Sequence, residues 1–265
     1  MKIRPCIDIH NGRVKQIVGG TLRGGRAAEN FVSREGAAHY AAIYRDLSLP
    51  GGHIIMLNSR TDEYYEADCR EAMSALNTYP GGMQAGGGIT PQTAGGFLSA
   101  GASHVIVTSY VFKDGRLREE ALHKMQESVG RDHLVLDLSC RRCPDGQYRV
   151  VTDRWQKFTD LVICDETLDF LRGECAEFLI HAADVEGKRA GVERDLVQVL
   201  GSWLRRQEKP FPVTYAGGIR SLQDLDLLME LSGGRMDATV GSALSLFGGD
   251  LSLRELAAHC GQGAG

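Results

Sequence analysis

Three observations predict that this 265-residue chain folds as a single α/β domain, a (β/α)8 TIM barrel with a two-fold half-barrel repeat. Its length suits one barrel, and no linker-like stretch divides it. Apolar runs of strand length alternate with helical patterns from one end to the other. Features of the first half recur in the same order in the second half. We therefore expect one domain over residues 1–265, with half-barrels at about 1–130 and 131–265; a doubly wound open sheet is the structural alternative.

The expected strands and helices follow from hydrophobic spacing. Each strand candidate is a short apolar run, and each helix candidate carries apolar residues on one face, as Ala38, Ala41 and Tyr44 do. Eight strands that alternate with eight helices are typical of a (β/α)8 barrel. In chain order the expected strands and helices alternate as Ile3–Ile9, Glu35–Leu47, His53–Leu57, Ala67–Leu76, Gly82–Ala85, Gln92–Ala100, His104–Thr108, Arg116–Val129, His133–Leu138, Glu166–Leu171, Glu177–Ala182, Glu193–Leu204, Pro212–Tyr215, Leu222–Leu231, Met236–Val240 and Leu251–His259.

The internal repeat favours the barrel over the open sheet. Asp8 ends the first expected strand and Asp137 ends the fifth, 129 positions further on. Two four-stranded half-barrels explain such spacing, whereas an open sheet does not predict it. Two further pairs of segments match at similar spacings, 85–89 (AGGGI) with 216–219 (AGGI) and 107–109 (VTS) with 240–242 (VGS).

Asp8 and Asp137 are the candidate catalytic residues. Each follows an apolar run, and the carboxyl ends of the strands form the active face of such a barrel. The first and fifth strands lie opposite each other, so the two carboxylates would face one another across the mouth. One can act as general acid and the other as general base if their surroundings separate their pKa values. The alternative is that each aspartate only caps the loop that follows its strand.

Two glycine clusters predict phosphate binding. They follow the third and seventh expected strands, where glycine lets backbone N–H groups approach an anion closely. Residues after the fourth and eighth strands add hydroxyl donors. Two such sites imply a long, bisphosphorylated small-molecule ligand. The alternative is that these glycines only form turns, in a chain that contains 33 Gly. The expected phosphate-binding residues are Gly87, Gly88, Thr108, Ser109, Gly217, Gly218, Gly241 and Ser242.

Composition excludes several classes of function. The formal charge of −4 and the pI of about 6.1 come with no basic stripe for nucleic acid. No stretch approaches about 18 consecutive apolar residues, and the N-terminus carries no targeting pattern, so we expect a cytoplasmic protein without a membrane partner. One C-x-x-C, from Cys140 to Cys143, lacks the second pair that zinc needs. Neither G-x-G-x-x-G nor a P-loop occurs, so we expect no metal and no nucleotide cofactor.

Several segments resemble the phosphoribosylformimino-aminoimidazole carboxamide ribotide isomerase family of histidine biosynthesis. The similarity covers nearly the whole chain, and residues 181–187 (HAADVEG) are similar to the eukaryotic branch of that family. The strongest matches are residues 6–16 (CIDIHNGRVKQ), 86–89 (GGGI), 135–139 (VLDLS), 155–157 (WQK), 215–221 (YAGGIRS) and 240–244 (VGSAL).

The resemblance implies an Amadori rearrangement, in which an aminoaldose ribosyl phosphate becomes an aminoketose. It implies that Asp137 is the general acid at the ring oxygen and that Asp8 moves the proton from C2. It implies no cofactor, because the amine nitrogen supplies the electrons; we also expect a monomer. Trp155 matches a tryptophan that stacks near the aminoimidazole, with a loop anchor as the alternative. The other residues expected to contact substrate are Lys15, Gly19, Gly20, Arg141 and Asp184, although Arg141 could equally be an exposed loop residue.

Two positions depart from the bacterial members of the family. The bacterial pattern has a threonine on the sixth strand near the acid, where this chain has Ala182 or Ala183. The second strand ends in an acidic residue in the bacterial type and in Asn58 here. The polar residues that could support the acid instead are His10, His181 and Asp184.

Three other functions stay open on the sequence. The sister cyclase, which makes imidazole glycerol phosphate, shares the repeat and both aspartates, but it has a catalytic lysine where this chain has Gln16. Lys15 is one position away and would face the other way in an extended strand. The other two are an isomerase that also acts on phosphoribosyl anthranilate and a non-catalytic barrel that binds sugar phosphates.

Overall fold

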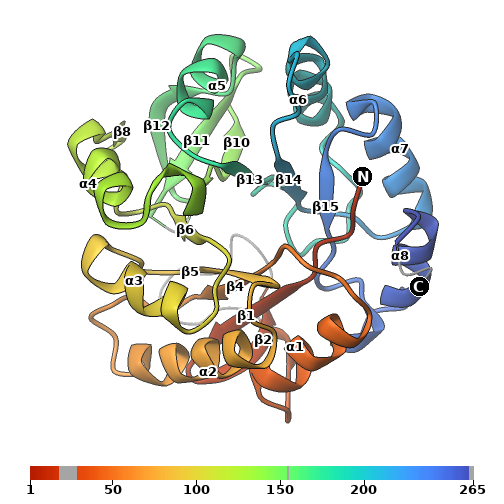
Figure 1. The fold of residues 1–265 in the computed structure, drawn as a ribbon. Helices are drawn as coiled ribbons and strands as arrows, with labels where there is room; N and C mark the ends of the chain where they lie inside the picture. Colours follow the sequence, from red (N-terminus) through yellow and green to blue (C-terminus); the bar gives the residue numbers. More distant parts are fainter. Residues whose placement is uncertain (18–28, 154, 263–265) are drawn as a thin grey trace.

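The structure is a computed structural model that describes residues 1–17, 29–153 and 155–262. Its fold is α/β: mostly parallel strands form one curled sheet, and the helices pack around the outside of this sheet (Figure 1). In the order of their hydrogen bonding, the strands are β15 (Asp237–Thr239), β14 (Val213–Ala216), β13 (Glu177–His181), β9 (Leu134–Asp137), β6 (Val105–Val107), β5 (Met83–Gly86), β4 (Gly52–Met56), β1 (Cys6–His10), β2 (Arg13–Ile17) and β3 (Glu29–Val32).

The chain just before β1 is hydrogen-bonded to β15, at the far end of this order. Ile3 pairs with Ala238 in parallel, and the Arg4 N–H donates to the Ala238 carbonyl at 2.9 Å. The Ala238 N–H in turn donates to the Lys2 carbonyl at 2.9 Å. The expected first strand therefore consists of two pieces, a bridge at Ile3 and β1 itself. Beyond β1, β2 and β3 continue the sheet as antiparallel strands.

Helices connect the parallel strands, as hydrophobic spacing predicted. Local signals start several of them: the Ser221 hydroxyl accepts the Asp224 N–H at the first turn of α7, and Thr90 and Thr93 form a capping box at the start of α3. The helices are α1 (Ala37–Asp46), α2 (Tyr65–Thr78), α3 (Pro91–Ser99), α4 (Glu119–Val129), α5 (Asp165–Arg172), α6 (Arg194–Arg206), α7 (Leu222–Ser232) and α8 (Leu253–His259), with short 3-10 helices at Arg131–His133 and Ser245–Phe247.

Besides β2 and β3, the loops after two strands contain β-structure that hydrophobic spacing did not predict. The segment after β9 forms a three-stranded antiparallel sheet, and the segment after β6 forms a two-stranded hairpin. The expected helix 116–129 therefore begins only at Glu119, because Arg116 and Leu117 pair within the hairpin. The additional strands are β7 (Phe112–Lys113), β8 (Arg116–Leu117), β10 (Cys140–Arg142), β11 (Tyr148–Thr152) and β12 (Lys157–Val162).

In the part of the chain that the structure describes, buried apolar residues form two separate cores. The larger core lies between the sheet and the surrounding helices. The smaller core consists of Ile106, Val135 and Leu179, whose neighbours on the same strands belong to the larger core. Since successive side chains of a strand point to opposite faces, the smaller core fills the inside of the curl. Side chains two residues further along share this inner face, which brings Asp137 and His181 to the end of the smaller core.

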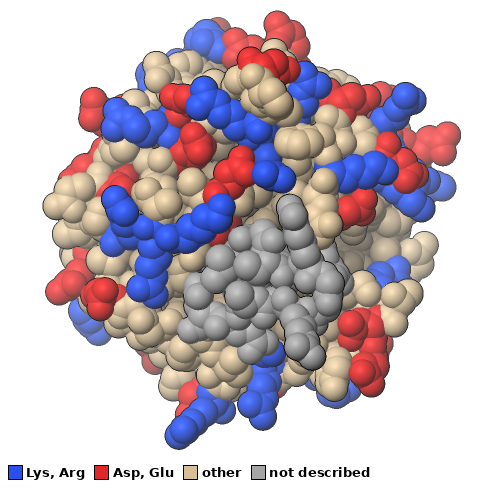
Figure 2. Space-filling view, turned by 180° about the vertical axis from the view of Figure 1, so that it is seen from behind, with Lys and Arg blue, Asp and Glu red and all other residues tan. Residues whose placement is uncertain are grey.

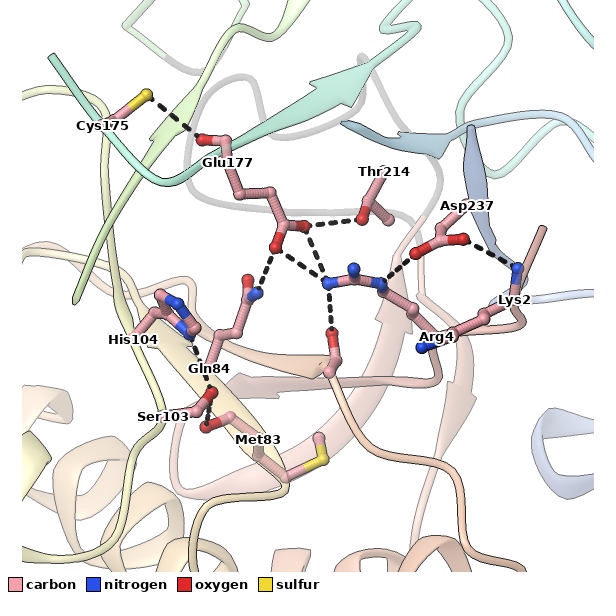
Figure 3. Close-up of polar contacts among 11 residues, drawn as sticks. Lys2, Arg4, Met83, Gln84, Ser103, His104, Cys175, Glu177, Thr214 and Asp237 are labelled. Carbon is pink, nitrogen blue, oxygen red and sulfur yellow. Dashed lines mark hydrogen bonds and ion pairs between the residues drawn. The ribbon is translucent and has the colours of Figure 1, made fainter. Parts of the chain in front are cut away.

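A buried ionic network lies at the other end of these strands (Figure 3). Arg4 Nη1 is 2.8 Å from Glu177 Oε2, and Arg4 Nε is 2.7 Å from Asp237 Oδ2. Glu177 also accepts hydrogen bonds from Gln84 Nε2 at 2.8 Å and from the Thr214 hydroxyl at 2.7 Å. The network thus joins the segment before β1 to β5, β13, β14 and β15.

Glu177→Ala is expected to lower the free energy of unfolding by about 3–5 kcal/mol, because Arg4 would keep its buried position without its main carboxylate. The Glu177 side chain is only 5% exposed, so water cannot replace it fully. Asp46→Ala is the matched control, since it removes an exposed ion pair with Arg45 and should cost less than about 1 kcal/mol. Urea unfolding measures both variants, and an equally small loss in the two would contradict this assignment.

Candidate active site

Asp8 and Asp137 line one pocket of about 750 Å³, which we call the large pocket. Asp8 lies in β1 and Asp137 ends β9, so both reach the end of the sheet where the carboxyl ends of the strands lie. A pocket of this volume can hold a sizeable small molecule. The large pocket is lined by Asp8, Ile55, Met56, Leu57, Asn58, Ser59, Arg60, Thr61, Gly87, Gly88, Ile89, Thr90, Ile106, Thr108, Ser109, Tyr110, Asp137, Val151, Thr152, Asp153, Trp155, His181 and Glu186.

A second cavity of about 30 Å³, the small pocket, adjoins the large one. Asp8, His181 and Glu186 line both pockets and therefore lie where the two meet. The first predicted glycine cluster, with its hydroxyl residues, lines the large pocket, and the second cluster lines the small one. The small pocket is lined by Cys6, Asp8, His53, His181, Glu186, Gly187, Arg189, Ala216, Gly217, Gly218, Ile219, Thr239, Val240, Gly241 and Ser242.

Asp137 is surrounded by hydrogen-bond donors. Its Oδ1 accepts from the Ser139 N–H at 2.9 Å, the Ser139 hydroxyl at 2.8 Å and His181 Nδ1 at 3.2 Å, and its Oδ2 accepts from the Thr108 hydroxyl at 3.2 Å. Burial alone would raise the pKa of Asp137, but the charge and hydrogen bond of His181 and the donors of Ser139 lower this pKa. Burial opposes protonation of His181, yet Asp137 raises the pKa of His181 to about 9. At neutral pH the pair therefore carries its proton on His181.

The pKa of Asp8 shifts in the opposite direction from that of Asp137. Burial, followed by the negative charge of Glu186, raises the pKa of Asp8 to about 7. The charge of His181 and a hydrogen bond from Gln16 Nε2, 3.3 Å from Asp8 Oδ2, oppose this rise. The two aspartates thus differ in proton affinity, which is what an acid–base pair requires.

Glu186 is a site residue that no motif in the sequence predicted. It lies in the loop between β13 and α6, where the Val185 N–H and the Glu186 N–H both donate to the Ala182 carbonyl at 3.1 Å. Gly187 follows with φ +68°, a conformation that favours glycine. The resulting turn directs the Glu186 side chain into the junction of the two pockets. The only sequence signal was its place in the run 181–187.

Of the three residues considered as supports for the acid, His181 contacts it directly. Asp184 instead binds Arg141, with Arg141 Nε 2.8 Å from Asp184 Oδ1. Neither Asp184 nor Arg141 lines either pocket, so their expected contact with substrate stays a prediction. Trp155 does line the large pocket, and its ring centroid is 6.1 Å from that of His181.

The remaining expected binding residues belong to the segment after β1. Gln16, not Lys15, faces Asp8, as the alternation of the strand predicts. Lys15 is buried on β2 and lines neither pocket, so its role as a substrate contact stays a prediction. Gly19 and Gly20 lie outside the described residues.

Two of the predicted phosphate-binding glycines are also required by the fold. Gly87 has φ +96°, and a Cβ there would lie 2.0 Å from the Met56 carbonyl oxygen. Gly218 has φ +73°, and a Cβ there would lie 2.0 Å from the Gly191 carbonyl oxygen. Larger residues at these positions would disturb the backbone itself, so such variants test folding before they test phosphate binding.

Among the described residues, one arginine lines each pocket close to its glycines. Arg60 lines the large pocket, where a Cβ on Gly88 would lie 2.8 Å from Arg60 Cγ. Arg189 lines the small pocket, and its guanidinium donates to the Ser242 carbonyl. The two arginines are 129 positions apart, the same spacing as the two aspartates. On the face shown in Figure 2, basic and acidic side chains are intermixed outside the grey residues.

Within residues 1–17, 29–153 and 155–262, no group of three or more His, Cys, Asp or Glu side chains could hold a metal ion. Cys140 and Cys143 are free thiols. None of the helices that the structure describes is long and apolar enough to cross a bilayer.

Comparisons with known proteins point to one family. A family model described as "Histidine biosynthesis protein" matches residues 2–251. A chloroplastic protein of Medicago truncatula is 45% identical over 264 residues, covering 97% of this chain and 81% of its own length. A protein of Neurospora crassa is 45% identical over 252 residues, covering 94% and 93%. A protein of Saccharomyces cerevisiae is 42% identical over 250 residues, covering 93% and 92%. All three are named isomerases of an imidazole-4-carboxamide that carries two phosphoribosyl groups.

Proposed function

The chain belongs to the histidine biosynthesis protein family, and on that premise we propose that it isomerises an imidazole-4-carboxamide with two phosphoribosyl groups from its aminoaldose to its aminoketose form. It is thus an aldose–ketose isomerase of histidine biosynthesis. The observation that carries the proposal is the junction of the two pockets, where carboxyl groups of different proton affinity lie between two glycine clusters.

The two ends of the site suit a ligand with two phosphates. The clusters at Gly87–Gly88 and Gly217–Gly218 offer backbone N–H groups, and Arg60 and Arg189 add one positive charge to each pocket. A substrate that spans both pockets has its middle next to Asp8 and His181, which line both. The large pocket has room for the aminoimidazole beside Trp155.

The proposed chemistry assigns one step to each aspartate. The Asp137–His181 pair delivers a proton to the ring oxygen, and the sugar opens to an iminium. Asp8, as a carboxylate, then removes the proton from C2, and the electron pair forms an enolamine. Protonation at C1 and loss of the C2 hydroxyl proton give the aminoketose. Asp137 keeps His181 charged and oriented, so the acid is the pair and not the Asp137 carboxyl by itself.

The fold proposal is a closed (β/α)8 barrel formed by one domain of two half-barrels. The Ile3–Ala238 bridge between the first segment and the last strand supports closure. The spacing of the helices supports the repeat, since α1 to α4 begin 128–134 positions before α5 to α8. A monomeric state and a cytoplasmic location stay predictions, and the plant relative is named as chloroplastic.

The cyclase alternative loses support at one position. The cyclase needs a lysine aimed at the site, and here the amide of Gln16 binds Asp8 while Lys15 lines neither pocket. No observation favours phosphoribosyl anthranilate as a second substrate.

A direct assay tests the proposed function. Purified protein is incubated with the aminoaldose in the presence of EDTA, and the ketose is measured by coupling to the cyclase. Turnover that depends on the protein is the expected result. No turnover, or turnover that requires an added divalent metal, would contradict it.

The pH dependence of kcat/KM is expected to be bell-shaped, with limits near pH 7 and pH 9. Below about pH 7 Asp8 is protonated and cannot accept the C2 proton. Above about pH 9 His181 has lost the proton that opens the ring. A pH series of wild type and His181→Gln measures both limits, and the variant should lose the upper one. A wild-type rate that is already constant from about pH 5, as an ordinary aspartate would give, would refute this assignment.

A further inference from the structure

Thr152 carries a hydroxyl group that has no hydrogen-bond partner among the described residues. Its side chain lines the large pocket, and the residue is only 4% exposed. A buried hydroxyl without a partner is unfavourable in the folded protein, because it has lost its hydrogen bonds to water. A ligand that enters the pocket can supply the missing hydrogen bond. The Thr152 hydroxyl therefore indicates a polar contact that forms only in a complex.

Thr152 ends β11, directly before the turn that carries Trp155. The Gln156 N–H donates to the Thr152 carbonyl at 3.0 Å and closes this turn, and Thr152 pairs with Lys157 across it. Trp155 has φ +64°, a conformation that bulky side chains rarely adopt, and it lines the same pocket. The turn thus holds an indole ring and a hydroxyl group on one wall of the large pocket.

These two groups suit different parts of an imidazole carboxamide. The indole of Trp155 can stack on the flat imidazole ring, but stacking alone discriminates poorly between one ring and another. A carboxamide has both a donor and an acceptor, and a threonine hydroxyl can bind either. The phosphates would lie elsewhere, at the glycine clusters, and the reacting carbons beside Asp8 and Asp137. The carboxamide is the polar group attached to the ring that Trp155 would hold.

We propose that Thr152 is a specificity-determining residue, whose hydroxyl binds the carboxamide of the substrate. The inference rests on the proposed function and names the group that recognises the substituent of the imidazole ring. A change of the Thr152 rotamer brings the hydroxyl to the pocket surface when the ligand is bound. The new hydrogen bond satisfies both partners, whereas a ring without the carboxamide gains nothing from the hydroxyl. The site therefore prefers the ring that carries the carboxamide.

Thr152→Val tests the proposal, because valine has nearly the shape of threonine and lacks the hydroxyl. The probes are the aminoaldose substrate and an analogue with hydrogen in place of the carboxamide. The wild type should prefer the substrate in kcat/KM, and Thr152→Val should lower this preference by about 10-fold. Its kcat with the substrate should stay near the wild-type value, since the hydroxyl touches no reacting atom. Thr152→Ser keeps the hydroxyl and should keep the preference.

Thr159→Val is the matched control, on the neighbouring strand β12 of the same small sheet. Thr159 is equally buried, but its hydroxyl donates to the Val150 carbonyl at 2.9 Å, and it lines neither pocket. This substitution should lower the urea midpoint of unfolding and leave the preference for the carboxamide unchanged. Thr152→Val should do the reverse, because its hydroxyl has no partner to lose in the ligand-free protein.

The outcomes separate the inference from the proposed function. With an active wild type, an unchanged preference in Thr152→Val overturns the inference alone. A kcat/KM that falls equally for both probes also overturns it, because the hydroxyl would then bind a part that the probes share. A urea midpoint that falls as far as that of Thr159→Val, or a Thr152→Val protein that does not fold, assigns Thr152 a structural role and overturns it too. A wild-type protein without turnover removes the proposed function, and this inference with it.

Discussion

Asp8→Asn is expected to lower kcat by about 10²–10⁴-fold, while KM changes far less. Asparagine has the shape of aspartate, and its amide oxygen can still accept the hydrogen bond from Gln16. It cannot take a proton from C2, so no enolamine forms. Substrate affinity should come mainly from the two phosphates, which the glycine clusters and arginines would hold away from the changed group. Steady-state kinetics with the coupled cyclase assay measures both constants.

Asp226→Asn is a suitable control for this variant, because Asp226 is exposed on α7 and pairs with His259 away from both pockets. Its kinetics should match the wild type. Near-normal turnover of Asp8→Asn would mean that Asp8 only caps the loop after β1. The acid–base mechanism would then have to be abandoned, even if the isomerase activity itself is confirmed.

Much of the fold could be predicted because strands and helices repeat with different hydrophobic periods. The parallel strands lie within a few residues of the expected runs, since their buried side chains leave a clear apolar signal. The strands β10 to β12 gave no such signal, because charged residues such as Arg141 and Arg149 interrupt them. Their pairing depends on a loop that folds back on itself, which the local pattern does not encode.

The candidate site could be predicted where strand position alone decides it. The positions of Asp8 and Asp137 follow from the ends of two apolar runs. The direction of the Gln16 side chain, toward Asp8, follows from the alternation of side chains along a strand. The contact of His181 with the acid required knowing where β13 ends, and the sequence left His10 and Asp184 as equal alternatives. The position of Glu186 depends on a turn closed by backbone hydrogen bonds, which residue types do not specify.

The sequence alone could not show whether the glycine clusters are required by the backbone or by phosphate binding. Gly87 and Gly218 have positive φ, and each lies against a carbonyl of a neighbouring segment. The chain would need glycine there even without a ligand. The phosphate interpretation is therefore better supported by Arg60 and Arg189, whose shared spacing and pocket positions the backbone does not require.

Asp137→Asn is expected to block ring opening, and an open-chain substrate analogue should partly restore its turnover. Without the charge of Asp137, the pKa of His181 falls and the proton for the ring oxygen is lost. The asparagine oxygen can still accept the hydrogen bonds of Ser139, and its amide N–H can donate to the Thr108 hydroxyl, so the fold should persist. Single-turnover kinetics with cyclic and open-chain substrates measures the rescue.

His181→Gln should show the same rescue, because the proton of the pair resides on His181 at neutral pH. Asp8→Asn should not be rescued, since removal of the C2 proton follows ring opening. The reverse pattern would exchange the two roles, and the structure gives that outcome a physical basis. With a pKa of about 7, Asp8 is partly protonated at neutral pH and could serve as the acid. Asp137, kept ionised by His181 and Ser139, would then be the base. The rescue experiment decides between these assignments because only the ring-opening residue becomes dispensable when the ring is already open.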